Sequence, residues 1–141
     1  MTPLAALEAA VVLSLIAPLR ELALAHREKC LARGVPFTFG SGFRSTGYQQ
    51  LLYEHPELHP GTPAAKPGES KHEHGAAYDN TAAMNDLQKL VFGEEAERLG
   101  LIWGGRFTDG AGHKTPDWGH CELPYSLPEL AAYARVAVGD A

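Results

Sequence analysis

The hydrophobic pattern of the first 34 residues predicts a long helical region. Thr2 is suited to cap a helix whose first turn contains Pro3, because proline lacks the N–H that the first turn leaves unpaired. Apolar residues and alanines continue to Leu31, and Pro18 is expected to kink or break the helix. Gly34 is the expected end, since glycine readily adopts the left-handed conformation that follows many helices.

Residues 35–40 (VPFTFG) then alternate in the manner of a short strand. Val35, Phe37 and Phe39 should lie on one face of it, because side chains alternate across a strand. This segment is the first expected strand of a sheet.

The rest of the chain mixes helical and strand patterns. Helices are expected over 46–55 and 83–99, strands over 76–80, 101–103 and 119–123, and a last helix opening at Ser126. The apolar side of helix 83–99 is expected to comprise Leu87, Leu90, Val91 and Leu99. Residues 56–68 are rich in proline and glycine and should form a long loop, which in a small domain is usually functional.

Together these elements predict a single α+β domain over residues 1–141. Helices stand at both ends and short strands lie between them, so a small, mainly antiparallel sheet flanked by helices is expected. A length of 141 residues with 45% hydrophobic and 21% charged residues suits one such core. No internal repeat and no second domain are evident.

Charge and cysteine content exclude several classes of protein. The net charge of −5 comes without a Lys/Arg cluster, which argues against nucleic-acid binding. Cys30 and Cys121 are the only cysteines, so neither a disulfide framework nor a Cys-x-x-Cys zinc site is expected. The apolar stretch 9–18 lacks a basic flank and is shorter than the about 20 residues that a membrane span needs. We therefore expect no signal peptide, no membrane span and synthesis in the cytoplasm.

Two polar, glycine-marked segments carry the candidate chemistry: residues 70–79 (SKHEHGAAYD) and 117–122 (DWGHCE). A catalytic zinc ion commonly takes two histidines and one carboxylate and leaves a fourth position for water. His72, Asp79 and His120 supply that set, and Gly75 allows the chain to turn between the first two. Asp117, three residues before His120, is suited to accept a proton from the attacking water.

Other interpretations of these residues stay open. Each histidine or aspartate has an ordinary role on the surface, in the core or in a turn. His72 and His74 form an H-x-H pair that could define a different metal site, and two histidines with one carboxylate also hold iron in oxygenases. A structural or ligand-binding zinc site without catalysis is the non-enzymatic alternative.

Four motifs in order resemble the M15 family of zinc peptidases, the D-alanyl-D-alanine carboxypeptidase and L-alanyl-D-glutamate endopeptidase group that includes phage endolysins. Residues 70–79 match S-x-H-x-x-G-x-A-x-D, and residues 117–122 match D-x-x-H-x-E. Residues 41–49 (SGFRSTGYQ) are similar to the family's S-G-[YF]-R-S-x3-Q segment, and residues 101–105 (LIWGG) to the stretch before the last motif. The resemblance covers most of residues 40–123.

The resemblance implies a role for each matching residue. His72, Asp79 and His120 would bind one zinc ion at the sheet, and Asp117 would be the catalytic acid/base. Arg44 would bind substrate or stabilise the developing oxyanion, which suits a fixed cationic fork. Gln49 and Ser70 would contact substrate, although Ser70 could equally orient His72 or cap the turn. Glu122 would be a partner of a ligand histidine.

Two further expectations concern the residues around these ligands. Trp103 and Trp118 would either wall the cleft or pack in the core. Cys121 departs from the family pattern, in which an aromatic residue often follows the ligand histidine. Strand alternation should turn Cys121 away from His120 and from the metal.

The implied function is hydrolysis of an amide bond in the peptidoglycan stem peptide. An L-alanyl-D-glutamate endopeptidase of the endolysin type is the first expectation, a D,D- or L,D-carboxypeptidase the second, and a non-catalytic metal-containing binding domain the third. No separate cell-wall-binding domain is expected, and the acidic balance of the chain offers little attraction to anionic walls. A monomer that reaches the wall after release, through a holin or another partner, is expected.

Overall fold

The computed structural model describes residues 2–59 and 63–137. The N-terminal helical region is two helices, α1 (Pro3–Leu13) and α2 (Ala17–Ala32), and Thr2 caps the first by accepting a hydrogen bond from the Ala5 amide. The break expected at Pro18 is confirmed, with the chain turning at residues 14–16, just before the proline. Gly34 follows α2 with φ of 76°.

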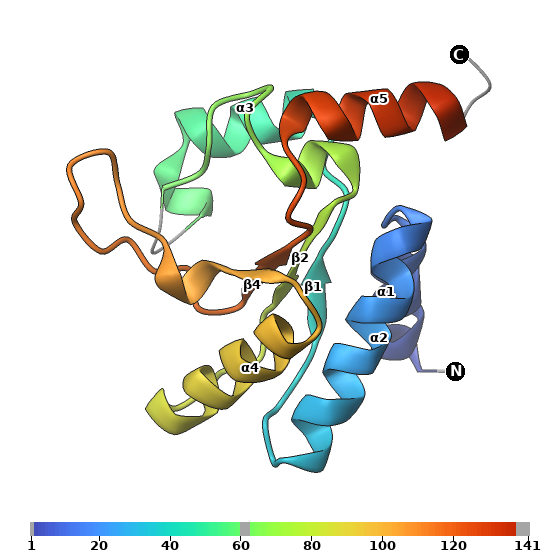
Figure 1. The fold of residues 1–141 in the computed structure, drawn as a ribbon, viewed down its shortest axis with the longest axis vertical. Coiled ribbons are helices and arrows are strands. Elements are labelled where there is room, and N and C mark those ends of the chain that lie inside the picture. Colours follow the sequence, from blue (N-terminus) through green and yellow to red (C-terminus); the bar gives the residue numbers. More distant parts are fainter. Residues whose placement is uncertain (1, 60–62, 138–141) are drawn as a thin grey trace.

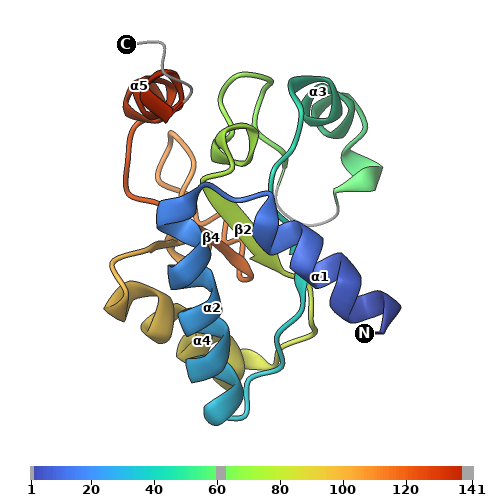
Figure 2. The same ribbon diagram turned by 90° about the vertical axis from the view of Figure 1, so that its right-hand side faces the viewer.

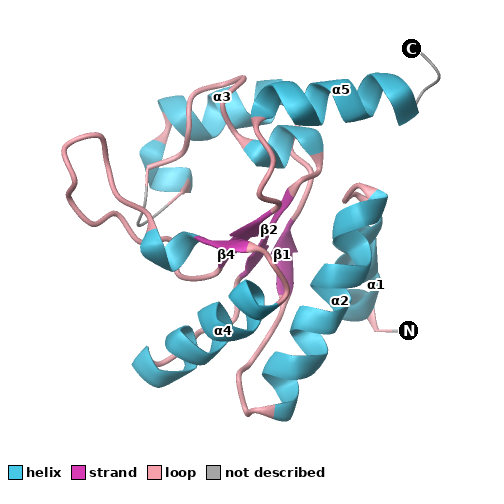
Figure 3. Cartoon of the chain, viewed as in Figure 1, coloured by secondary structure: helices cyan, strands magenta, loops and turns pink. Residues whose placement is uncertain are grey.

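Four short strands form one antiparallel sheet in the order β1-β2-β4-β3 (Figures 1 and 3). The strands are β1 (Phe39–Ser41), β2 (Ala77–Asn80), β3 (Ile102–Trp103) and β4 (His120–Glu122). The two central strands, β2 and β4, are thus distant in sequence and adjacent in space. The predicted α+β class with a small antiparallel sheet flanked by helices is confirmed.

The first strand is shorter than predicted. Only the end of segment 35–40 pairs with a neighbour, because the Asn80 side chain takes the place of ladder hydrogen bonds further upstream. Its Oδ1 accepts from the Thr38 amide at 2.8 Å, and its Nδ2 donates to the Pro36 carbonyl at 2.9 Å. The expected inward face is nevertheless present, since Val35, Phe37 and Phe39 are all buried.

The helices lie around the sheet in two groups (Figures 1 and 2). α1 and α2 run along one side, and α4 (Asp86–Arg98) lies at one end of the molecule. α3 (Thr46–Glu54) and α5 (Leu127–Ala137) lie at the other end. Short 3-10 helices cover 56–58, 71–74 and 104–106. No helix in the described ranges is long and apolar enough to cross a membrane.

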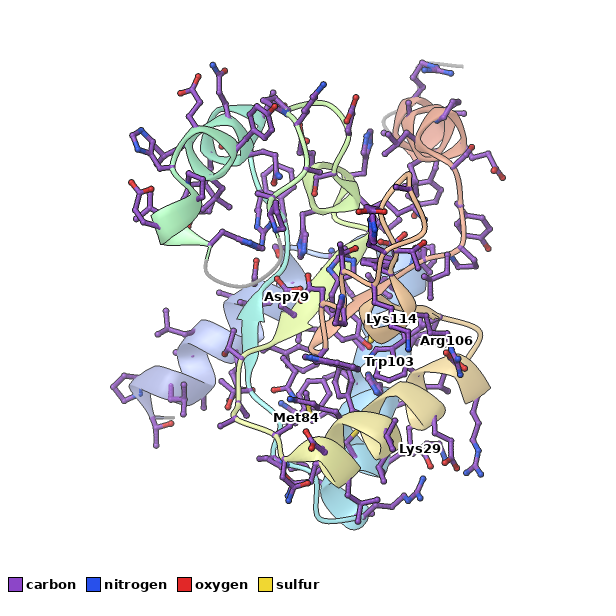
Figure 4. The ribbon with its side chains drawn as sticks, turned by 90° about the vertical axis from the view of Figure 1, so that its left-hand side faces the viewer. Lys29, Asp79, Met84, Trp103, Arg106 and Lys114 are labelled. Carbon is purple, nitrogen blue, oxygen red and sulfur yellow. The ribbon has the colours of Figure 1, made fainter. Side chains whose placement is uncertain are left out.

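The predicted buried face of α4 is confirmed only in part: Val91 and Leu99 pack against the core, whereas the two other leucines do not. The expected apolar residues Leu87 and Leu90 are 71% and 59% exposed, and Phe92, Gly93 and Ala96 face inward instead. Gly93 explains this orientation: a Cβ there would lie 2.3 Å from the Trp103 ring, so the helix lies directly on the indole (Figure 4). Burial of a large aromatic ring outweighs that of two leucines at the helix edge.

Candidate metal centre

The three predicted ligands come together from three elements. Asp79 on β2 and His120 on β4 are directly paired across the antiparallel ladder, so their side chains share a face. His72 comes from the 3-10 helix at 71–74 that precedes β2. The ligand atoms of all three lie within 4.8 Å of one another, and Figure 4 shows Asp79 near the middle of the molecule.

Gly75 brings His72 back over the sheet, as its position in the sequence suggested. The residue has φ of 65°, a left-handed conformation that costs other residues energy. A Cβ at this point would also lie 2.9 Å from the Ser14 carbonyl oxygen. The Gly75 carbonyl accepts from the Ile16 amide, which ties the turn to the break between α1 and α2.

The hydrogen bonds of His72 fix which of its ring nitrogens faces the cluster. Nδ1 lies 2.7 Å from the Gly42 carbonyl oxygen, and because a carbonyl only accepts, Nδ1 carries a hydrogen. Nε2 lies in the cluster, 3.3 Å from Asp79 Oδ2. A metal ion would therefore bind His72 through Nε2, while the hydrogen bond from Nδ1 keeps the ring oriented.

His120 is oriented by a carboxylate. Its Nε2 lies 2.8 Å from Glu122 Oε1, so Nε2 donates and Nδ1 faces Asp79 Oδ1 at 3.1 Å. Lys71 holds Glu122 in turn, with 2.6 Å between Nζ and Oε2. The expected partnership of Glu122 with a ligand histidine is thus present as a hydrogen bond.

The donor set fits a metal ion. Two imidazole nitrogens and a carboxylate point toward one another, and such a group of acceptors is stable only with a cation, either a proton or a metal, between them. Burial acts to raise the pKa of Asp79, but His72 and His120 hold it well below its usual value. Burial acts to lower the pKa of His120, while Asp79 and Glu122 raise it to about 10.

Asp117 lies beside the cluster but is not one of its three converging residues. Its Oδ2 lies 4.0 Å from His120 Nδ1, and 31% of the side chain is exposed. Burial raises the pKa of this carboxyl, with the charge of His120 acting in the opposite direction. Gly104 permits the position: its carbonyl accepts from the Asp117 amide, and a Cβ on it would meet the Asp117 carbonyl oxygen at 2.4 Å.

Arg44 lies against the carboxylate ligand. Its Nη2 is 3.0 Å from Asp79 Oδ2, its Nε is 3.2 Å from Ser41 Oγ, and only 8% of its side chain is exposed. An ordinary solvated arginine is thereby excluded. The guanidinium is held in a fixed orientation next to the cluster, as a substrate-binding role requires.

Comparison with known proteins agrees with this geometry. A family model described as D-alanyl-D-alanine carboxypeptidase (VanY) matches residues 15–101, more than half of the chain. The chain belongs to this family. The carboxypeptidase family and the M15 peptidases of the resemblance are peptidoglycan-hydrolysing enzymes, so the chain is a peptidase of that class. The matched range holds Arg44, His72 and Asp79, whereas Asp117 and His120 lie beyond it, and β4 brings His120 into the cluster.

Solved structures of peptidoglycan peptidases share the fold. An L-Ala D-Glu endopeptidase from Serratia marcescens is 19% identical, with a TM-score of 0.54 over 82% of this chain and 85% of its own. An L,D-carboxypeptidase from Streptococcus pneumonia is 22% identical, with a TM-score of 0.50 over 80% and 70%. A further LD-carboxypeptidase, LdcB, is 21% identical, with a TM-score of 0.50 over 80% of this chain and 69% of its own. No curated protein sequence matches the chain significantly.

Gln49 and Ser70, two other predicted site residues, make hydrogen bonds that stabilise the surrounding structure. Gln49 is 1% exposed, with its Oε1 3.4 Å from Arg44 Nη1 and its Nε2 donating to the Ala65 carbonyl at 2.8 Å. It links Arg44 to the loop after α3. Ser70 Oγ accepts from the His72 amide at 3.2 Å and caps the short helix, the turn-capping alternative. A substrate contact for either residue stays a prediction.

Trp103 and Cys121 belong to the core, whereas Trp118 is 38% exposed and packs beside Trp103, with 5.9 Å between the ring centroids. Trp103 is buried and donates from Nε1 to the Trp118 carbonyl at 2.9 Å, so core packing rather than cleft lining describes it. Cys121 is buried on the far side of β4, 4.0 Å from His26 Nδ1, as strand alternation predicted. An aromatic residue does lie beside His120: the ring centroid of Phe107 is 5.4 Å from that of the histidine.

Two grooves meet at the metal centre. One groove runs along α1, where Leu4, Leu7 and Val11 line it, and it also includes Asp79. The other groove is lined by apolar residues such as Ala65, Phe107 and Leu127 and by polar ones such as Lys71 and Glu122, and it includes His72 and His120. Sequence patterns missed both grooves, because their walls come from segments far apart in the chain.

Proposed function

We propose that the chain is a zinc-dependent L-alanyl-D-glutamate endopeptidase acting on the peptidoglycan stem peptide. The observation that carries this proposal is the position of the metal centre at the junction of two grooves. An endopeptidase must accommodate substrate on both sides of the bond that it cuts. A cleft continuing in both directions meets that need.

The charged residues of the grooves also favour an endopeptidase over a carboxypeptidase. A carboxypeptidase requires a cation for the terminal carboxylate of its substrate. Within the described residues, the Lys and Arg side chains that line the two grooves are Arg44 and Lys71. Both already face carboxylates, Arg44 with Asp79 at 3.0 Å and Lys71 with Glu122 at 2.6 Å.

In the proposed mechanism, His72, Asp79 and His120 hold the zinc ion. Zinc bound there would polarise the scissile carbonyl and lower the pKa of a water molecule. The Asp117 carboxylate, 4.0 Å from His120 Nδ1 and partly exposed to the cleft, is placed to accept a proton from an attacking water and to return it to the leaving amine. Arg44 offers fixed donors to the oxygen on which negative charge develops.

A carboxypeptidase is the second candidate, because the matching family model and two solved structures of the same fold bear that description. Digestion of purified peptidoglycan followed by mass analysis separates the two. Endopeptidase action releases peptides that begin with D-glutamate, while carboxypeptidase action removes one terminal residue. Parallel digests with chelator, and with zinc restored after chelation, test the metal. Release of single residues alone would overturn the endopeptidase proposal.

A further inference from the structure

Within the described part of the chain, three residues line both grooves: Arg44, His59 and Asp117. A peptide that passes from one groove to the other must pass these three side chains at the metal centre. Arg44 and Asp117 already have roles in the proposed reaction. His59 has none, and it lies in the loop after the 3-10 helix at 56–58, outside all four family motifs.

The imidazole of His59 lies close to the reacting groups without belonging to the metal cluster. Burial is the main influence on the Asp117 carboxyl and raises its pKa, while the charge of His59, like that of His120, acts against this increase. The ligand atoms that converge within 4.8 Å are those of His72, Asp79 and His120. His59 is therefore near the catalytic carboxylate and is half-buried in the cleft wall.

Substrate contact is the use that this position favours. Arg44 directs donors to Asp79, Ser41 and Gln49, so much of its hydrogen-bonding capacity is engaged by the protein. A peptide unit at the junction presents a carbonyl and an amide, and the ring nitrogens of an imidazole are suited to hydrogen-bond such groups. A second donor, from a different segment of the chain, would fix the orientation of the peptide.

We propose that His59 is a further substrate-contacting residue, which hydrogen-bonds the peptide unit at the scissile bond beside Asp117. This inference rests on the proposed peptidase function at this cleft. It assigns to the 56–68 loop a direct part in the reaction, in addition to shaping the choice of bond.

Steady-state kinetics on a soluble muropeptide test the proposal. His59→Ala should lower kcat by ~10²-fold, the typical effect of removing a donor to the transition state. His59→Gln, which keeps a donor and an acceptor, should recover part of this loss. Zinc content and the thermal midpoint should match the wild type. The matched control is His55→Ala, since His55 lies on the same segment, pairs with Glu57 and lines neither groove.

A binding measurement keeps the test independent of which bond is cut. In zinc-loaded Asp117→Asn protein, titration with intact muropeptide should shift the imidazole resonances of His59, identified by their absence in the His59→Ala double variant. Those of His55 should stay in place. Unchanged His59 resonances, or a kcat for His59→Ala within about threefold of wild type, would overturn the inference. A wild type that cuts a different bond would count against the endopeptidase proposal alone.

Discussion

His120 Nδ1 and Asp79 Oδ1 lie 3.1 Å apart across the ladder between β2 and β4. The register of the two central strands therefore determines the geometry of the metal centre. A shift of one residue would turn one of these side chains to the opposite face of the sheet and disperse the cluster.

Metal removal should destabilise the protein. A ligand that binds only the folded state stabilises it, by about 2.7 kcal/mol at a free concentration one hundred times its dissociation constant. Added zinc should raise the thermal midpoint, and chelator should reverse the increase. His120→Ala should abolish the response, whereas His113→Ala, at an exposed histidine outside the cluster, should keep it. A zinc response that survives in His120→Ala would contradict this ligand assignment.

Asp117→Ala should retain zinc and lose peptide hydrolysis. The carboxylate stands 4.0 Å from His120 Nδ1 and is placed to move protons rather than to bind the metal. Loss of a general acid/base typically lowers kcat by about 10²–10⁴-fold. Zinc content by atomic absorption and turnover on muropeptide measure the two effects. Full activity in the variant would rule out the proposed mechanism.

Glu122→Gln should weaken metal binding more than catalysis. The Glu122 carboxylate accepts from His120 Nε2 and keeps Nδ1 available to the metal. Replacing such a partner typically lowers metal affinity by about 10–100-fold. Competition with a chromophoric chelator measures the affinity, and activity should return at saturating zinc. Glu129→Gln, on α5, is the matched control. Equal affinities for Glu122→Gln and wild type would show that this hydrogen bond does not tune the site.

Gly104→Ala should disturb both Asp117 and His120. The added Cβ would stand 2.4 Å from the Asp117 carbonyl oxygen and 2.9 Å from His120 Cβ, so the turn before β4 must move. We expect a large decrease in kcat in protein that still folds. Gly110→Ala is the control, because a Cβ there meets nothing within 4 Å. Wild-type kcat in Gly104→Ala would show that the position of Asp117 tolerates this shift.

His26 should make stability depend on pH. Burial lowers its pKa to about 4, and Nε2 donates to the Phe92 carbonyl while Nδ1 accepts from the Tyr78 hydroxyl. Below pH 6.5 the unfolded chain binds a proton that the folded protein excludes, so the free energy of unfolding should decrease. The decrease should level off below about pH 4. Its total should be roughly 3 kcal/mol, because each unit between the pKa values of the unfolded and folded states contributes about 1.4 kcal/mol.

Denaturant unfolding in chelator between pH 4 and 7 measures this effect. The free energy of unfolding of the His26→Gln variant should fall less steeply with decreasing pH than that of the wild type. The difference in slope should correspond to at most about one bound proton. His113→Gln, at an exposed histidine, should follow the wild-type slope. Parallel curves for His26→Gln and wild type would refute the role given to His26.

Local signals allowed the sequence to predict most helices and the identity of the ligands. Thr2, Pro18 and Ser126 act through backbone groups only a few residues away, so the cap or break that each provides is visible in the linear pattern. The motif spacing likewise identified His72 and Asp79 because Gly75 and the short helix between them are local features. Membership of the carboxypeptidase family confirmed the resemblance on which the predicted roles depended.

Tertiary structure decided what depends on distant partners. The inward face of α4 was set by the Trp103 ring against Gly93, and the length of β1 by the Asn80 side chain, neither of which periodicity reveals. The junction of the two grooves is lined by Arg44, His59 and Asp117, which come from segments far apart in the chain. The sequence by itself predicted which groups form the candidate metal centre, since ligand chemistry resides in single side chains. Only the fold determined how substrate approaches them, since a cleft is made by surfaces brought together from the whole chain.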